Sequence, residues 1–170
     1  MYLGRMRKIR AVSVLIILLA LFTSGCGGRY DYDVNKVTYV FNSGDQDGAE
    51  LDVYSSDCTV IKYAIRPYSD SGVDLFKGEI PSDDQCDKKE YTISQDDWNS
   101  IVNAVNENRF MALPEELPEV GATDGSTRYI EVFTSEWDHR SGGYCAGNGS
   151  GKEHQRFSEV VSALQKATLN

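Results

Sequence analysis

The first half of this chain contains several β-strand patterns joined by connections too short for a helical crossover. Residues 34–41 are rich in Val, Thr, Tyr and Phe, and residues 59–66 alternate, with Ile61, Tyr63 and Ile65 on one face. Parallel neighbours need a crossover of a dozen or more residues, whereas antiparallel neighbours need only a turn. The pattern therefore predicts an antiparallel meander.

Further strands complete the predicted sheet. We expect short strands at 50–54 and 89–93, and a strand at 73–80 that pairs with 59–66 after the turn at Pro67. Later in the chain, residues 128–135 and 139–144 are predicted to form a hairpin through a Ser-Glu-Trp-Asp turn.

Two amphipathic helices are also predicted. The first begins after Ser94, which forms a capping-box-like pair with Asp97, and it ends near residue 108. Its apolar positions follow helical spacing: Trp98, Ile101, Val102 and Val105. The second follows the Gly-rich loop 147–151 and repeats the spacing at Phe157, Val160, Val161 and Leu164. We therefore expect the α+β class, an antiparallel sheet (meander plus hairpin) with two amphipathic helices packed on one face.

The N-terminus has the composition of a secretory signal. The first ten residues carry four basic side chains and no acid, and an apolar run follows from 11 to 22. A helix of that length rises only about 18 Å, too short for a hydrocarbon core of about 30 Å. The run therefore predicts a signal peptide that is removed rather than a membrane span.

The residues that end this segment are Leu21-Phe22-Thr23-Ser24-Gly25-Cys26. They resemble the lipobox of bacterial lipoproteins, although Thr23 stands where that family usually has Leu. The resemblance implies that Cys26 is lipidated and becomes the new N-terminus, and multiple acyl chains anchor a protein stably. We expect a lipoprotein signal peptide at 1–25, a lipidated cysteine and short tether at 26–33, and a single α+β domain at 34–170. The location implied is the cell membrane, on its extracytoplasmic side.

Charge limits the partners of the mature chain. Removal of residues 1–25 takes away four basic groups and changes the formal charge from −9 to −13. So negative a charge argues against binding of nucleic acid or anionic lipid head groups through a basic patch. The expected partners are the membrane, through the lipid anchor, and an envelope protein, with no nucleic acid.

Three cysteines remain after the anchor: Cys58, Cys86 and Cys145. Three pairings are open, and the sequence alone does not choose between them. We favour a disulfide between Cys58 and Cys86, because both lie in polar loops that flank one predicted hairpin. Such a bridge would stabilise the fold by about 3–4 kcal/mol through loss of unfolded-chain entropy. In an anaerobe all three thiols would stay reduced.

Five short motifs mark the C-terminal half: Trp98, Leu113-Pro114-Glu115, Asp124-Gly125-Ser126, Gly142-Gly143-Tyr144 and Arg156-Phe157. On these motifs, residues 98–164 resemble small uncharacterised lipoproteins of Gram-positive anaerobic bacteria. The resemblance implies an envelope location and no known activity, so no catalytic residue follows from it.

Motifs for metal binding are incomplete. Residues 43–48 begin like an EF-hand loop, but Tyr54 stands at the twelfth position, where the loop needs a bidentate acid. His139, Cys145 and His154 match no zinc spacing. We therefore expect no metal, and we expect both histidines to be surface residues.

Motifs for cofactor binding and catalysis are incomplete too. A phosphate loop at 146–153 would need Gly in place of Ala146 and Ser or Thr in place of Glu153. The acidic loop 115–124 could offer paired carboxylates to a glycosidase, but nothing there predicts a buried acid with a raised pKa. No nucleophile elbow lies between a strand and a helix. We expect no cofactor and a non-catalytic role.

Trp137 is the strongest candidate for a contact residue. It lies at a predicted hairpin tip beside Asp138 and His139, where an exposed ring could anchor a protein or stack on a sugar. The alternative is a ring folded back over the sheet edge. With Glu115 and Asp124, these residues form the predicted partner contact. The sequence predicts a membrane-anchored accessory or protein-binding component of the envelope; the alternatives are envelope carbohydrate binding and a wall-polymer hydrolase.

Overall fold

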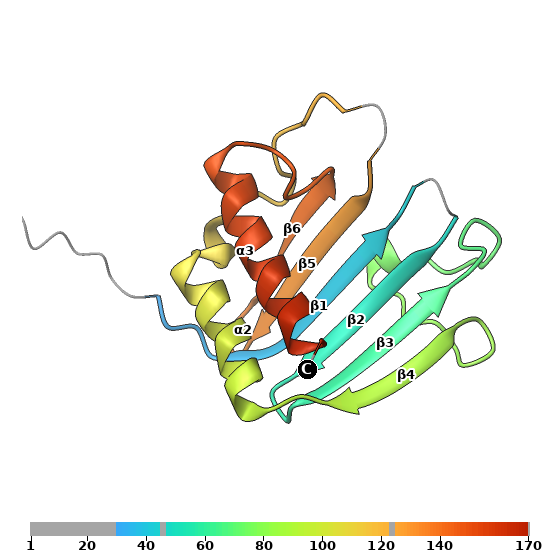
Figure 1. The fold of residues 1–170 in the computed structure, drawn as a ribbon, viewed down its shortest axis with the longest axis horizontal. Helices are drawn as coiled ribbons and strands as arrows, with labels where there is room; N and C mark the ends of the chain where they lie inside the picture. Colours follow the sequence, from blue (N-terminus) through green and yellow to red (C-terminus); the bar gives the residue numbers. More distant parts are fainter. Residues whose placement is uncertain (1–29, 45–46, 123–124, 170) are drawn as a thin grey trace, which may run out of the picture.

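Six antiparallel strands form one open sheet, in the order β4-β3-β2-β1-β5-β6, in the computed structural model, which describes residues 30–44, 47–122 and 125–169 (Figure 1). The strands are β1 (Val34–Asn42), β2 (Ala49–Ser55), β3 (Thr59–Ile65), β4 (Asp87–Thr92), β5 (Thr127–Thr134) and β6 (Asp138–Tyr144). The helices are α2 (Gln95–Glu107) and α3 (Lys152–Ala167), with short 3-10 turns η1 (Leu75–Lys77) and η2 (Phe110–Ala112). The predicted α+β class, a meander plus a hairpin, is confirmed.

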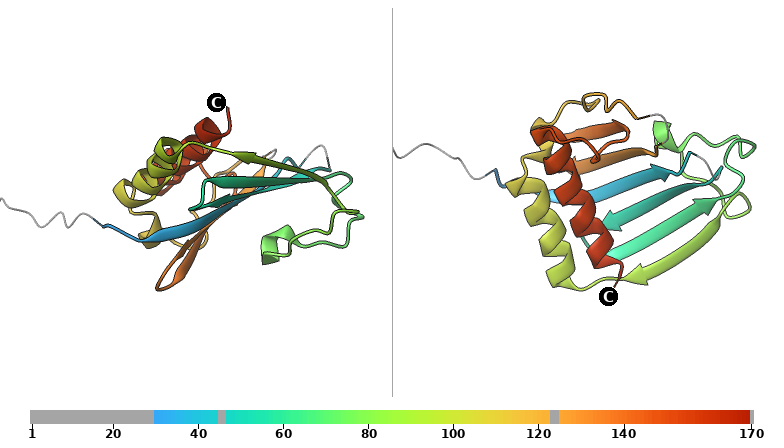
Figure 2. Two further views of the ribbon diagram at one scale, coloured as in Figure 1. Left: turned by 90° about the horizontal axis from the view of Figure 1, so that it is seen from below. Right: turned by 45° about the horizontal axis from the view of Figure 1, so that its top comes forward.

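Both helices pack on one face of the sheet (Figures 1 and 2). The capping box predicted for α2 is present: the Asp97 N–H donates to Ser94 Oγ at 3.1 Å, and the Ser94 N–H donates to the Asp97 carboxylate at 3.3 Å. The apolar stripes of α2 and α3 lie against β1, β2, β3 and β5 in the main core. No helix among the described residues combines the length and apolar content that a membrane crossing requires.

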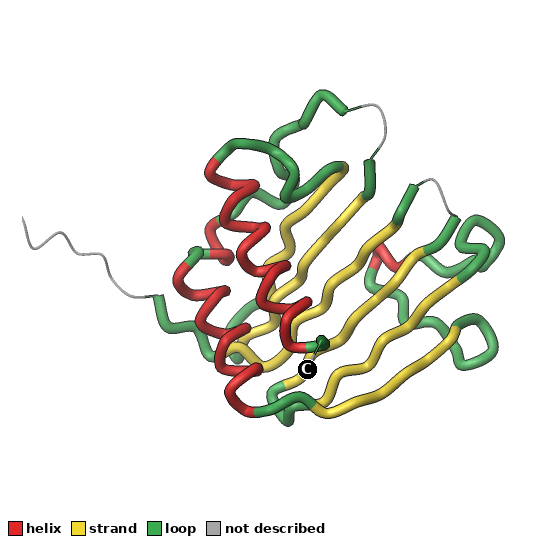
Figure 3. Tube along the Cα trace, in the orientation of Figure 1, coloured by secondary structure: helices red, strands yellow, loops and turns green. Residues whose placement is uncertain are grey.

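The opposite face, called here the outer face, is covered in part by the long β3–β4 connection (Figures 2 and 3). Leu75 in η1 is buried against apolar side chains of β1, β2 and β3, which form a second, smaller core. The strand predicted at 73–80 is therefore wrong. Asp74 caps η1 and Gly78 ends it in a left-handed conformation, and β3 pairs with β4 instead.

Candidate functional site

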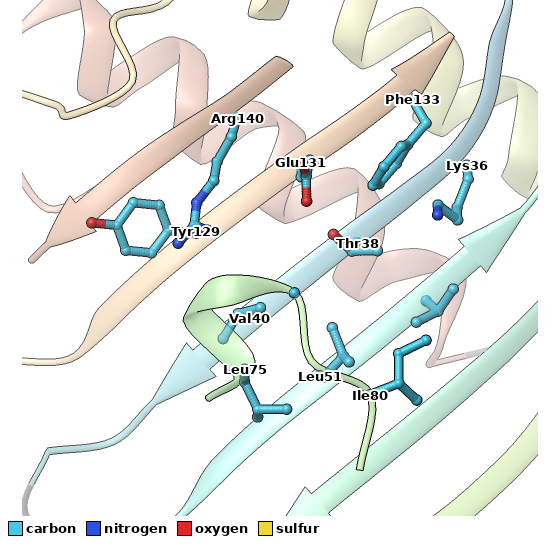
Figure 4. Close-up of a pocket in the computed structure, with 12 residues that line it drawn as sticks. Lys36, Thr38, Val40, Leu51, Leu75, Ile80, Tyr129, Glu131, Phe133 and Arg140 are labelled. Carbon is cyan, nitrogen blue, oxygen red and sulfur yellow. The ribbon is translucent and has the colours of Figure 1, made fainter. Parts of the chain in front are cut away.

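The outer face carries an apolar pocket of about 120 Å³ between the sheet and the η1 segment (Figure 4). Its apolar walls are Val40, Leu51, Val53, Leu75, Ile80 and Phe133. Ile80 is 65 % exposed, so apolar surface continues from the pocket to solvent. Thr38 of β1 also lines the pocket, and its side chain points toward the outer face.

Charged side chains border this pocket. The Lys36 ammonium group lies 3.5 Å from the centre of the Phe133 ring, and the Arg140 guanidinium carbon lies 4.0 Å from the centre of the Tyr129 ring. Arg140 also donates a hydrogen bond to a backbone carbonyl of η1, which ties that segment to β6. Glu131 stands opposite Arg140 in the β5–β6 register. The border therefore combines two cations and one anion around an apolar interior.

A second candidate surface lies where the chain enters the sheet, and we name it the aromatic end. It comprises Tyr30, Tyr32, Arg109, Trp137 and His139. The rings of Tyr30 and Tyr32 stack with centroids 5.9 Å apart, and Trp137 meets Tyr32 and His139 edge-on, each at 6.0 Å. Trp137 is 43 % exposed and Tyr30 is 45 % exposed. The Trp137 ring at the hairpin tip is thus nearly half exposed, and its other side contacts Tyr32.

Hydrogen bonds position the aromatic end. The Thr134 hydroxyl donates to the Trp137 carbonyl at 2.6 Å and accepts from the Trp137 N–H at 3.1 Å, which closes the β5–β6 turn. The Tyr32 N–H donates at 3.0 Å to the side-chain oxygen of Asn106, a buried residue in the last turn of α2. The turn and the N-terminal segment are therefore held against the same end of the domain.

The other predicted contact residues lie at different places relative to Trp137. The His139 ring contacts the Trp137 ring, and the charge of Glu115 acts on His139. Asp138 is exposed at the start of β6. The Glu115 carbonyl accepts a β6 backbone N–H at 3.0 Å near the far end of that strand. Asp124, like the predicted lipidation site Cys26, lies outside the described residues.

A polar pair, the buried Asp52 and the half-buried Lys62, occupies the helix side of β2 and β3. The Asp52 carboxylate lies 3.1 Å from the Lys62 ammonium group. Tyr54 donates to the Leu164 carbonyl of α3 at 3.1 Å, and its hydroxyl lies 3.4 Å from Asp52. Burial raises the pKa of Asp52 to about 6, against the opposing effect of Lys62. The carboxyl group is only 5 % exposed, at the wall of a surface pocket that Lys62 and Tyr91 also line.

The expectation that both histidines are surface residues is wrong. His154 is buried at the start of α3, where its Nδ1 accepts the Gly147 N–H at 3.2 Å and its Nε2 donates to the Pro118 carbonyl at 2.9 Å. Its ring lies so close to Gly149 that a Cβ there would be 2.5 Å from it. His139 is half-buried, and burial lowers its pKa. His154 is therefore a structural residue that joins two loops to α3.

The favoured disulfide between Cys58 and Cys86 is wrong, because these residues lie at opposite ends of the β3–β4 hairpin. The Ile93 N–H, just after β4, donates to the Cys58 carbonyl at 2.9 Å, whereas Cys86 directly precedes β4. The separation is about 20 Å for a strand of that length, and a disulfide needs Cα atoms within about 7 Å. Both thiols and that of Cys145 are free. In the described part of the chain, no cluster of three acidic, His or Cys side chains could hold a metal ion.

The outer-face pocket was not predicted from the sequence, although the sequence contains a signal for it. β1 carries apolar side chains on both faces, with Val37 on the helix side and Val40 on the outer side. In β2, Tyr54 lies on the helix side and Leu51 lies on the outer side. A strand that is apolar on both faces is covered on both, so this pattern predicts a second layer over the outer face.

No protein-family model matches this chain, and no curated protein is significantly similar to it. The candidate sites therefore rest on the geometry and chemistry of this chain alone.

Proposed function

We propose that the protein is a membrane-anchored lipoprotein of the envelope that binds a partner protein without catalysis. The lipobox-like run that ends at Cys26 supports the anchor on the extracytoplasmic side of the membrane. The observation that carries the binding role is the apolar pocket of about 120 Å³ on the outer face, with the exposed Ile80 beside it. Apolar pockets that receive one anchoring side chain dominate the energetics of protein interfaces.

The pocket suits one apolar side chain of the partner, next to a carboxylate. An apolar cavity of about 150 Å³ holds one benzene molecule, so the pocket has room for a single side chain of that order. Lys36 and Arg140 outnumber Glu131 on the border, in a mature chain whose formal charge is −13. This local positive charge favours an acidic neighbour on the partner.

A photo-crosslinking residue in place of Ile80, in the full lipidated protein in its native membrane, tests the proposal. We expect a crosslinked partner peptide that contains an apolar residue beside an acid. The crosslink should be lost when Thr38→Phe fills the pocket. A crosslinker at the exposed Asn103 of α2 is the matched control and should give no such product.

Crosslinking of equal yield with and without Thr38→Phe would show that the pocket does not receive the partner. Free Cys26 in the purified protein, identified by mass spectrometry, would reject the anchor.

A further inference from the structure

The aromatic end is the part of the domain closest along the chain to the proposed anchor. Tyr30 follows Cys26 by four residue steps, and fully extended chain covers at most about 14 Å over that length. A lipid on Cys26 would hold that residue at the membrane surface. Tyr30 could then lie no farther than this from the layer of lipid head groups, and Trp137 belongs to the same cluster of rings.

The side chains of the aromatic end suit an interface between water and lipid. Tyr and Trp rings concentrate at the head-group level of membranes, because each has an apolar body and a polar group. Tyr30 and Trp137 are both nearly half exposed, and the Arg109 guanidinium lies 5.3 Å from the centre of the Tyr30 ring. An arginine beside exposed aromatic rings can also reach lipid phosphate.

The charges around these rings decide which kind of lipid surface fits. Asp31, Asp33, Glu136 and Asp138 are all exposed around the aromatic end, and Arg109 is the cation that contacts its rings. Acidic side chains are repelled by anionic lipids. Contact with the membrane would therefore depend on the aromatic rings, and would be stronger on zwitterionic than on anionic lipid.

We propose that the aromatic end docks on the lipid head-group layer, with Tyr30 and Trp137 inserted into it, once Cys26 is lipidated. This inference rests on the proposed anchor. Trp137, which the sequence predicted to contact a partner protein, would then contact the membrane. β1 begins at the aromatic end and runs about 30 Å away from it. Docking thus lets the strands rise from the membrane, and the outer-face pocket faces sideways toward neighbouring membrane proteins.

Fluorescence quenching by brominated lipid tests the docking. The chain has two tryptophans, and Trp98 is 4 % exposed in the core, so it is a built-in reference. Full lipidated protein is placed in phosphatidylcholine vesicles whose acyl chains carry bromine near the head group. The spectrum of a Trp137→Phe variant, which retains only Trp98, is subtracted to isolate Trp137. We expect the Trp137 emission to fall about twofold or more, and the Trp98 emission to stay unchanged.

Two further measurements identify the cause of that quenching. The double variant Tyr30→Ser, Tyr32→Ser should reduce it, with unchanged Trp98 emission as the check that the fold is intact. Replacing half of the lipid by phosphatidylglycerol at low salt should reduce it as well.

The result that would overturn docking is vesicle-bound protein whose Cys26 is lipidated by mass spectrometry and whose Trp137 emission is unquenched. Docking would also be overturned, in favour of a protein contact, if a photo-crosslinking residue in place of Trp137 captured a protein in the native membrane while Trp137 itself was not quenched by brominated lipid. Unlipidated Cys26 would overturn the anchor and the docking together, so the two failures are distinguishable.

Discussion

Asp52 and Lys62 stand directly opposite each other on β2 and β3, with 3.1 Å between carboxylate and ammonium, on the side of the sheet that the helices cover. Asp52 is 5 % exposed, and one of its oxygens has no hydrogen-bond partner among the described residues. The ion pair and the Tyr54 hydroxyl at 3.4 Å therefore compensate only part of the cost of burying this carboxylate.

This burial makes the stability of the fold depend on pH. The pKa of Asp52 is raised from 3.8 to about 6, so the folded state binds the proton more tightly than the unfolded state. The contribution of protonated Asp52 to the free energy of unfolding is fully present below about pH 4. It is lost as the pH rises through about 6, and the loss is about 3 kcal/mol at most. Urea unfolding at pH 4.5 and at pH 7.5 measures this loss of stability, and we expect the Asp52→Asn variant not to show it. The exposed Asp31→Asn is the control, and an unchanged pH dependence in Asp52→Asn would contradict the assignment.

His154 should be important for stability although it catalyses nothing. His154→Ala would leave the Gly147 N–H and the Pro118 carbonyl without their partner and open a cavity beside α3. We expect a loss of about 2–4 kcal/mol in the free energy of unfolding, measured by denaturant titration. Glu159→Ala, on the exposed side of the same helix, should change it by less than about 0.5 kcal/mol. Equal effects of the two substitutions would reject the structural role of His154.

Gly142 in β6 tolerates no side chain. A Cβ at this position would lie 2.1 Å from the Arg128 carbonyl oxygen and 2.7 Å from the Tyr129 Cα, both in the backbone of β5. Backbone cannot move aside as a side chain can, so Gly142→Ala should destabilise the fold by about 3 kcal/mol or more. Gly121→Ala is the matched control, since nothing lies within 4 Å of its added Cβ. Thermal melting of the two variants distinguishes them, and a stable Gly142→Ala would mean that the β5–β6 pairing is different.

The three thiols should differ in reactivity. Cys58 and Cys86 are partly exposed and should be alkylated in the folded protein, whereas the buried Cys145 should react only on unfolding. Burial, and then Asp83, raise the pKa of Cys86, so this thiol should react slowly near neutral pH. Peptide mapping without reductant should recover Cys58 and Cys86 separately alkylated. A peptide that joins them would contradict the strand register described above.

Local features could be predicted from the sequence. The capping box of α2 and its buried stripe follow from contacts within one or two helical turns, and both are present. The β5–β6 hairpin with Trp137 in its turn also depends on neighbours in the chain. Side chain and backbone groups a few residues apart meet in almost any context, so these predictions needed no knowledge of the tertiary structure.

Features that join distant segments could not be predicted in this way. The β3–β4 connection was expected to form a strand at 73–80, but Leu75 covers the outer face instead. The bridge between Cys58 and Cys86 was favoured from loop composition, while the strand register separates the two residues. The candidate pocket was missed for the same reason, since its walls come from four strands and one loop.

The alternating side chains of β3 show which features depend on the local sequence and which depend on the tertiary structure. The sequence alone determined that Ile61, Tyr63 and Ile65 share one face and that Lys62 lies on the other, because side chains alternate along a strand. Only the tertiary structure decided what covers each face: the apolar side packs under the η1 segment, and Lys62 lies on the helix side against Asp52. Strand periodicity is a local property of the backbone, whereas the layer that covers a face is chosen by the packing of segments far away in the chain.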